Sequence, residues 1–209
     1  MSIETLKPME IEKKSFEIIG KLLEEQEKVL CPEQEAVIKR VIHTTADLEY
    51  AEKMYFSSHA ISQISNAFQN GADIVTDTQM AKAGINKALL ASFGGQVHCF
   101  MSDNDVAEQA KLRGVTRAVV SMEKACRLEK PLVFAIGNAP TALIRLCELM
   151  KTGRLTPAGV IGVPVGFVNV VESKELLMQT DVPSIITLGR KGGSNIAAAV
   201  CNALLYQLR

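Results

Sequence analysis

One stretch, LVFAIGNAP at residues 132–140, decides the fold class of this chain. Its first five residues are all apolar, which is typical of a strand that is buried on both faces of a parallel sheet. Gly137 and Asn138 then suit a tight turn, and Pro140 suits the first turn of a helix, where its missing N–H has no helical partner anyway. The stretch therefore predicts a strand that turns directly into a helix.

Four more short apolar runs resemble this strand, and segments with helical periodicity separate them. With Leu132–Gly137, the predicted strands are Asp73–Asp77, Gln96–Phe100, Gly159–Val165 and Ser184–Gly189. Strands that alternate with helices indicate βαβ units, and hence a parallel sheet with helices on both faces. We expect a three-layer α/β/α fold with a doubly wound parallel sheet of about five strands. No linker or repeat is visible, so residues 1–209 are expected to form a single domain.

The first third of the chain precedes this pattern and is predicted to be an N-terminal helical segment. Apolar residues recur at helical spacing over residues 11–23, and Ser15 places a hydroxyl group on their stripe. A second helix is expected to begin at Pro32. Thr44–Asp47 resembles a capping box, which predicts a third helix over Leu48–Phe56.

Composition argues against several classes of protein. Lys+Arg and Asp+Glu both number 23, so the chain has no net charge and lacks the basic character of a general nucleic-acid binder. Apolar stretches such as Gly159–Val171 contain Gly and Pro and are shorter than the ~18 residues that suggest a membrane span. The five cysteines are scattered and never form Cys-x-x-Cys, and Met1–Lys14 has no signal-peptide core. These features favour a cytoplasmic protein with reduced thiols.

The residues that follow the predicted strands indicate where a ligand binds. In an open parallel sheet, ligands bind beyond the carboxyl ends of the strands, at the point where the strand order reverses. The segments at these ends are Thr76–Gln79, Gly137–Pro140, Pro164–Phe167 and Gly189–Ser194. Two of them run into helices, whose N-terminal N–H groups suit an anion, although turn chemistry alone explains each segment taken singly. Lys191 precedes both glycines of the last segment, so it is not a nucleotide-binding P-loop.

Three histidines are candidates for chemistry: His43, His59 and His98. His98 and Cys99 are neighbours on a predicted strand, so they point to opposite faces and cannot share a metal ion. His59 is expected at the surface, in the first turn of a helix. Arg40 precedes His43 by three residues, so the two share a helical face, and imidazole is well suited to proton transfer near neutral pH. A structural role for His43 stays open at this point, because a lone histidine is more often structural than catalytic.

Residues 40–47, Arg-Val-Ile-His-Thr-Thr-Ala-Asp, are similar to a motif of the precorrin-8X methylmutase family, which includes the cobalt-precorrin-8 enzymes. Further motifs of that family follow in the same order and at the same spacing. They are Ser15–Ile19, Gly137–Leu143, Pro164–Val168 with Glu172–Lys174, and Gly189–Ser194. One such motif would be a weak signal, but five collinear motifs make the resemblance specific.

The resemblance implies a flavodoxin-like fold, a homodimer, and an isomerase of cobalamin biosynthesis. Members of the family move a methyl group between adjacent ring C carbons of a corrin-type tetrapyrrole, (cobalt-)precorrin-8. The product is hydrogenobyrinic acid or its cobalt equivalent, cobyrinic acid, and no cofactor or metal is implied. The family's catalytic histidine corresponds to His43. The expected substrate-binding residues are Ser15, Arg40, Arg117, Asn138 and Ser194.

The chemistry of such a substrate agrees with these residue types. The macrocycle carries many carboxylates, which Arg40 and Arg117 can bind in bidentate fashion and which helix N-termini at Pro140 and Ser194 can also accept. A proton added to the conjugated ring makes it electron-poor and eases migration of the methyl group. An imidazole such as that of His43 can give this proton and take it back.

Two alternatives and one choice stay open. A corrinoid-binding carrier without turnover would share the arginines and anion-binding loops but would not need His43. A regulatory or flavin-binding module is the second alternative, although Asp77 alone lacks the acidic cluster of a phosphoacceptor. Thr44–Asp47 looks more like the cobalt-containing branch of the family than the metal-free one, but this segment is too short to decide between the branches.

Overall fold

The structure, a computed structural model, describes residues 7–209, so the first six residues of the Met1–Lys14 segment lie outside it. In this part of the chain six strands form one sheet in the order β1-β6-β5-β4-β2-β3. The strands are β1 (Met54–Phe56), β2 (Asp73–Thr76), β3 (Val97–His98), β4 (Leu132–Ile136), β5 (Gly159–Gly162) and β6 (Ser184–Thr187). All pairs are parallel except that of β1 with β6. The five predicted strands are confirmed, each shorter than predicted, in the 2-1-3-4-5 order of flavodoxin-like sheets.

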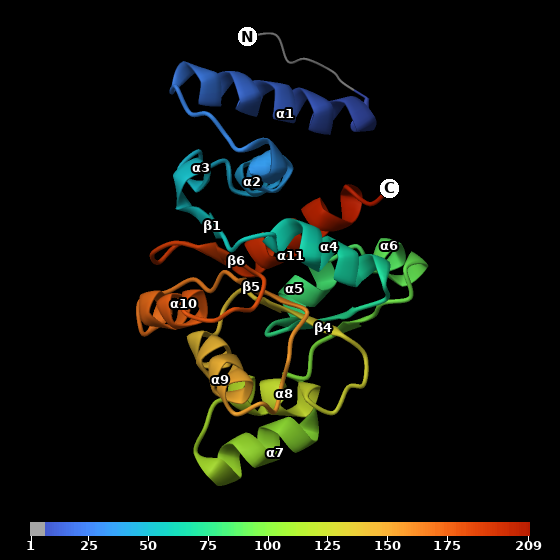
Figure 1. The fold of residues 1–209 in the computed structure, drawn as a ribbon, viewed down its shortest axis with the longest axis vertical. Coiled ribbons are helices and arrows are strands. Elements are labelled where there is room, and N and C mark those ends of the chain that lie inside the picture. The colour runs from blue at the N-terminus through green and yellow to red at the C-terminus, as the bar shows by residue number, and fades with distance from the viewer. Residues whose placement is uncertain (1–6) are drawn as a thin grey trace.

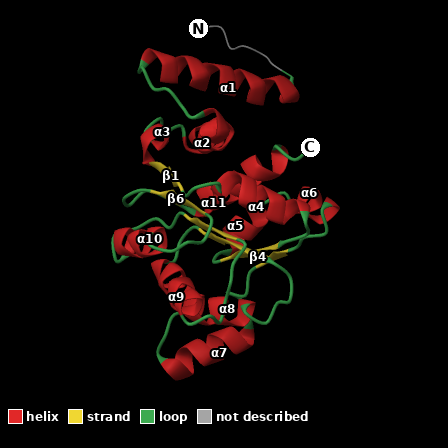
Figure 2. Cartoon of the chain, viewed as in Figure 1, coloured by secondary structure: helices red, strands yellow, loops and turns green. Residues whose placement is uncertain are grey.

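Helices cover both faces of this sheet, as expected (Figures 1 and 2). One layer contains α2 (Pro32–Thr45), α3 (Tyr50–Lys53), α4 (Ala60–Gln69), α5 (Gln79–Gly84), α6 (Lys87–Ser92) and α11 (Ser194–Tyr206). The opposite layer contains α7 (Asn104–Arg113), α8 (Arg117–Ala125), α9 (Pro140–Lys151) and α10 (Val170–Met178). The three-layer α/β/α prediction is therefore confirmed.

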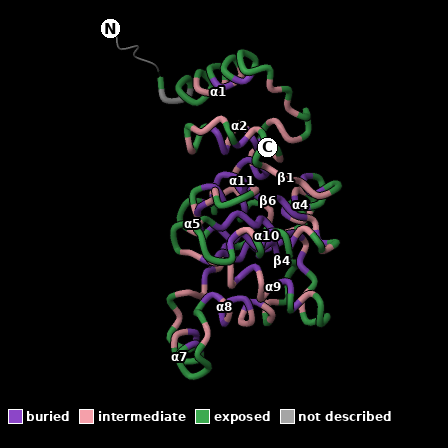
Figure 3. Tube along the Cα trace, turned by 90° about the vertical axis from the view of Figure 1, so that its left-hand side faces the viewer, coloured by how far each residue is buried: buried purple, intermediate pink, exposed green. Residues whose placement is uncertain are grey.

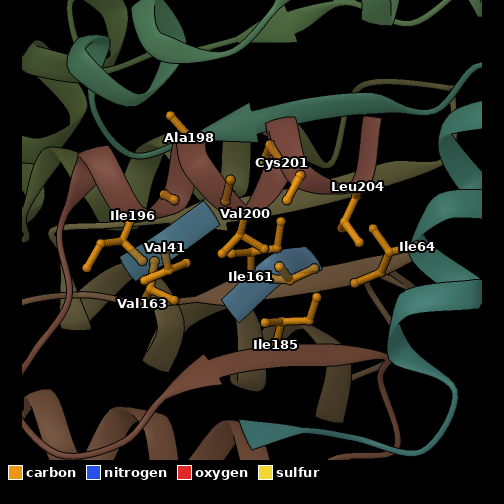
Figure 4. Packing of buried hydrophobic residues seen from close by; sticks show 14 of the residues in the cluster. Val41, Ile64, Ile161, Val163, Ile185, Ile196, Ala198, Val200, Cys201 and Leu204 are labelled. Carbon is orange, nitrogen blue, oxygen red and sulfur yellow. The ribbon is translucent and has the colours of Figure 1, made fainter. Parts of the chain in front are cut away.

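Side chains of β4 point alternately to the two faces of the sheet, so this strand packs against both helix layers. Val133 and Ala135 are part of the core under α2 and α11, whereas Phe134 and Ile136 are part of the core under α8 and α9. All five residues of β4 are buried, as its continuous apolar sequence predicts. Figure 4 shows the first of these cores, in which apolar side chains of α11 pack against those of the central strands.

The prediction of a helix over Leu48–Phe56 is wrong for most of its length. α2 continues through Thr44, whose hydroxyl donates to a carbonyl one turn earlier at 2.9 Å and so does not cap a new helix. Ala46, with φ of 54°, ends α2. Within Leu48–Phe56 only the four residues of α3 are helical. Met54–Phe56 forms β1, because Tyr and Phe favour strands and the free edge of β6 offers backbone partners.

α1 (Pro8–Glu25) packs on α2, which in turn packs on α11. Figures 1 and 3 show α1 at one end of the molecule, with much of its surface exposed. Ile19 and Leu23 are buried against α2. Ile11, Ile18 and Leu22 are respectively 53%, 47% and 38% exposed, so the apolar stripe of α1 is wider than the surface that α2 covers.

Candidate functional site

His43 lies in the last turn of α2, beside α1. Its Nδ1 is 2.7 Å from the hydroxyl oxygen of Ser15, although the two residues are 28 positions apart in the sequence. The hydroxyl can donate to an unprotonated Nδ1 or accept from a protonated one, so this contact suits both states of the imidazole. Among the hydrogen bonds of residues 7–209 none engages Nε2. That nitrogen is therefore the one available to a ligand.

The Ser15–His43 pair lies in a groove of about 530 Å³ between α1 and the C-terminal end of α2. Its walls are mainly apolar and include the exposed side chains of Ile11, Ile18 and Leu22. His43 itself is exposed. A mainly apolar groove with a few convergent polar groups is the usual form of a small-molecule site.

Arg40 faces away from this groove. Its guanidinium lies 4.9 Å from the ring centre of Phe16 and 5.0 Å from that of Tyr206, which is cation–π distance on both sides. It also forms an ion pair with Glu12 and lines a separate hollow of about 370 Å³ between α1, α2 and α11. The Phe16 ring is also 5.4 Å from the His43 ring. Arg40 and His43 are thus linked through Phe16 and do not open into one pocket.

Asp77 organises the carboxyl ends of β2 and β4, between which the strand order reverses. Its carboxylate accepts the backbone N–H groups of Gly137, Asn138 and Ala139 at 2.9, 2.8 and 2.6 Å. Burial raises the pKa of Asp77 above its usual value, while the three N–H donors lower it. These three loop N–H groups are therefore already engaged. The side chain of Asn138 is exposed at this point.

Ser194 begins α11 and contacts the loop that follows β2. Its hydroxyl oxygen accepts from Thr78 at 2.8 Å, and Thr78 caps α5 by accepting the Ala81 N–H at 3.0 Å. A Cβ at Gly137 would lie 2.6 Å from the Ser194 Cα, so only glycine allows the β4 loop to approach α11 this closely. The ends of β2, β4 and β6 therefore meet.

Arg117 is the first residue of α8 and is exposed. The hydroxyl groups of Thr116 and Thr141 are 2.9 Å apart, which places the start of α8 beside the start of α9. Arg117 therefore lies along the same edge as Asn138 and Ser194. Within residues 7–209, the predicted pair that the structure brings into direct contact is Ser15 and His43.

A cluster of three charged side chains, which the sequence did not reveal, joins the end of α2 to the carboxyl end of β6. Lys191 Nζ is 2.5 Å from Asp47 and 2.9 Å from Glu49. The hydrogen bond from Lys191 holds the pKa of Asp47 below its usual value. The two carboxylates raise the pKa of Lys191 to about 12. Asp47 and Lys191 lie inside the motifs at residues 40–47 and 189–194, and Glu49 lies two residues beyond the first of them.

In residues 7–209 no three His, Cys, Asp or Glu side chains gather closely enough to hold a metal ion. No helix of the described chain combines the length and the apolar character that a membrane crossing requires.

The comparisons with known proteins agree on one family. The sequence profile of precorrin-8X methylmutase matches residues 10–207. A cobalt-precorrin-8 methylmutase of Salmonella typhimurium is 48% identical over 97% of this chain and 96% of its own length. One of Priestia megaterium is 44% identical over 96% and 88%. A crystal structure of a precorrin-8X methylmutase from Thermus thermophilus superposes with a TM-score of 0.84 at 37% identity, covering 94% of this chain and 96% of the other.

Proposed function

This chain belongs to the precorrin-8X methylmutase family, an isomerase family, and we propose that it moves a methyl group between adjacent ring C carbons of cobalt-precorrin-8 or precorrin-8. The product is cobyrinic or hydrogenobyrinic acid, intermediates of cobalamin biosynthesis. The higher identity to relatives named for the cobalt substrate, 48% and 44% against 38% for a precorrin-8X methylmutase of Pseudomonas aeruginosa, favours the cobalt form. We assign the reaction to the cytoplasm, because the scattered cysteines suit a compartment in which thiols stay reduced.

The observation that carries this proposal is the contact of Ser15 with His43 Nδ1 in an apolar groove. His43 Nε2 gives a proton to the conjugated macrocycle, which makes the ring electron-poor and eases the methyl shift. The same nitrogen takes the proton back once the methyl group has moved. The Ser15 hydroxyl accommodates both steps, since it accepts from Nδ1 of the imidazolium and donates to Nδ1 of the neutral ring.

The edge of the sheet supplies the anchors for the substrate. The apolar groove walls suit the flat face of the macrocycle. Arg117, Asn138 and Ser194 lie along the edge where its carboxylates emerge. Arg40 faces a separate hollow, and it can bind a substrate carboxylate there by giving up Glu12, because an ion pair with this half-exposed residue is worth only about 0–1 kcal/mol.

We also propose that the enzyme is a homodimer. Phe167 and Val168, in the loop after β5, are 86% and 78% exposed. Adjacent exposed apolar side chains mark surfaces that bind other proteins. This loop follows Gly166, which has φ of 140°, and its backbone shape is therefore built for glycine. We assign the loop to contact with a second copy of the chain.

The test compares two histidine variants with the native enzyme on cobalt-precorrin-8 and on precorrin-8. We expect His43→Ala to lose about 10²–10⁴-fold in kcat, the usual contribution of a general acid and base, while it still binds the substrate. His59→Asn is the matched control, because His59 is exposed and its φ of 58° is one that asparagine tolerates. Product formation is followed by the visible spectrum and substrate binding by the absorbance of the bound ring. Full turnover by His43→Ala would contradict the proposal.

A further inference from the structure

A buried lysine outside the groove holds the loop that follows β6. Lys174, in α10, is only 2% exposed, and a buried ammonium group is costly because it has lost its water. Burial lowers its pKa to about 8. Its Nζ donates to the carbonyl oxygens of Gly189 and Lys191, both at 2.8 Å. No ion pair in the described part of the chain offsets its charge, so these carbonyls are its compensation.

The loop curls around this ammonium group. Gly189 has φ of 67°, a conformation that glycine adopts freely. The Lys191 carbonyl also accepts from the Thr187 hydroxyl at 2.8 Å. The Arg190 carbonyl accepts from the Gly166 N–H at 3.2 Å. The carbonyl groups of three consecutive residues are thus fixed, which leaves the backbone at Lys191 little freedom.

The side chain of Lys191 connects this fixed loop to the segment that follows α2. It pairs with Asp47 and Glu49, which follow His43 by four and six residues. An ion pair this exposed is weak on its own, because ordering two long side chains costs entropy. A fixed backbone at Lys191 removes part of that cost. Because helix ends open most readily, the pair restrains the turn that carries His43.

We propose that Lys174 is a positioning residue of the methylmutase site, which fixes Lys191 and through it the end of α2 that keeps His43 against Ser15. The inference deepens the function proposed above and rests on the role given there to His43. Lys174 itself is buried and touches no substrate.

The first test is Lys174→Met, which keeps the length of the side chain and removes its charge. The change removes the donor to two carbonyl oxygens, so we expect the melting temperature to fall by a few degrees, and the kinetics are measured well below it. We expect kcat to fall about 5–50-fold, since small misplacements of a catalytic group are costly, while KM changes less than about twofold. Backbone amides in residues 188–194 and 43–49 should exchange hydrogen faster. Lys151→Met, at an exposed lysine that ends α9, is the control and should match the native protein.

The second test asks whether Lys174 acts through Lys191. Lys191→Met should lower kcat by a similar factor, and Lys174→Met should add nothing in that background, because coupled residues are not additive. Unchanged kcat in Lys191→Met, unchanged exchange in Lys174→Met, or additive losses would each overturn the inference. The exchange measurement needs no substrate, so it reports on the loop even if turnover by His43→Ala has refuted the role of the histidine.

Discussion

Replacing Ser15 by alanine tests the proposed site by removing a single oxygen atom. The change deletes the hydroxyl 2.7 Å from His43 Nδ1 and preserves α1, because alanine is the better helix former. A hydrogen bond between neutral groups contributes about 0.5–1.5 kcal/mol, and one to a charged group about 1.5–3 kcal/mol. The bond holds the imidazole in one orientation, and losing it should cost about 1 kcal/mol of that positioning. Since about 1.4 kcal/mol is tenfold in rate, we expect kcat to fall about 3–10-fold.

The assay is the initial rate of the visible spectral change, at saturating substrate. Ser62→Ala is the matched control, because the Ser62 hydroxyl is exposed and donates only to the carbonyl of His59, the residue before α4, at 3.0 Å. The double variant Ser15→Ala/His43→Ala should be no slower than His43→Ala, since the hydroxyl acts only through the imidazole. A full native rate in Ser15→Ala would refute the reasoning. So would a further loss in the double variant.

Three more predictions follow from the loops and charges around the site. A Cβ at Gly192 would lie 2.2 and 2.5 Å from two backbone carbonyl oxygens, so Gly192→Ala should cost about 1–3 kcal/mol, and the melting temperature in a thermal scan should fall by several degrees. Phe167→Glu should shift the protein towards the monomer in sedimentation analysis, whereas Leu112→Glu, at an equally exposed residue of α7, should not; a dimer in both would remove this loop from the interface. Lys191 lowers the pKa of Asp47, so this pair stabilises the fold above the ordinary carboxyl pKa, and its contribution is lost as the pH falls through the lowered value. The melting-temperature gap between the native protein and Asp47→Asn should therefore be present at pH 7 and close towards pH 3, and a constant gap would contradict the assignment.

The strands could be predicted because their signal is local. Continuous apolar runs such as Leu132–Ile136 need no knowledge of the rest of the chain to be recognised as buried strands. β1 could not be found in this way, because Met54–Phe56 takes its conformation from β6, more than a hundred residues later in the sequence. Its residues suit a strand or a short helix, and the tertiary pairing decides.

The candidate site could be predicted only in part, because some of its contacts depend on residues far apart in the sequence. The resemblance marked Ser15 and His43, and their contact follows once α1 packs on α2. Lys174 lies in the Glu172–Lys174 motif and Asp77 in a segment that follows a predicted strand, but nothing in the sequence assigned either side chain a structural role. The partners of Asp77 lie sixty residues away, and a lysine in a helix is usually a surface residue until a loop folds over it.

The two outer strands of the sheet constrain how two copies can assemble. β1 has three residues and β3 has two, so each border offers few free peptide groups to another chain. Such short borders are a common protection against strand-by-strand growth into fibres. A pair of these molecules must therefore join through helices or loops, and a sheet that continues from one copy into the next is not expected.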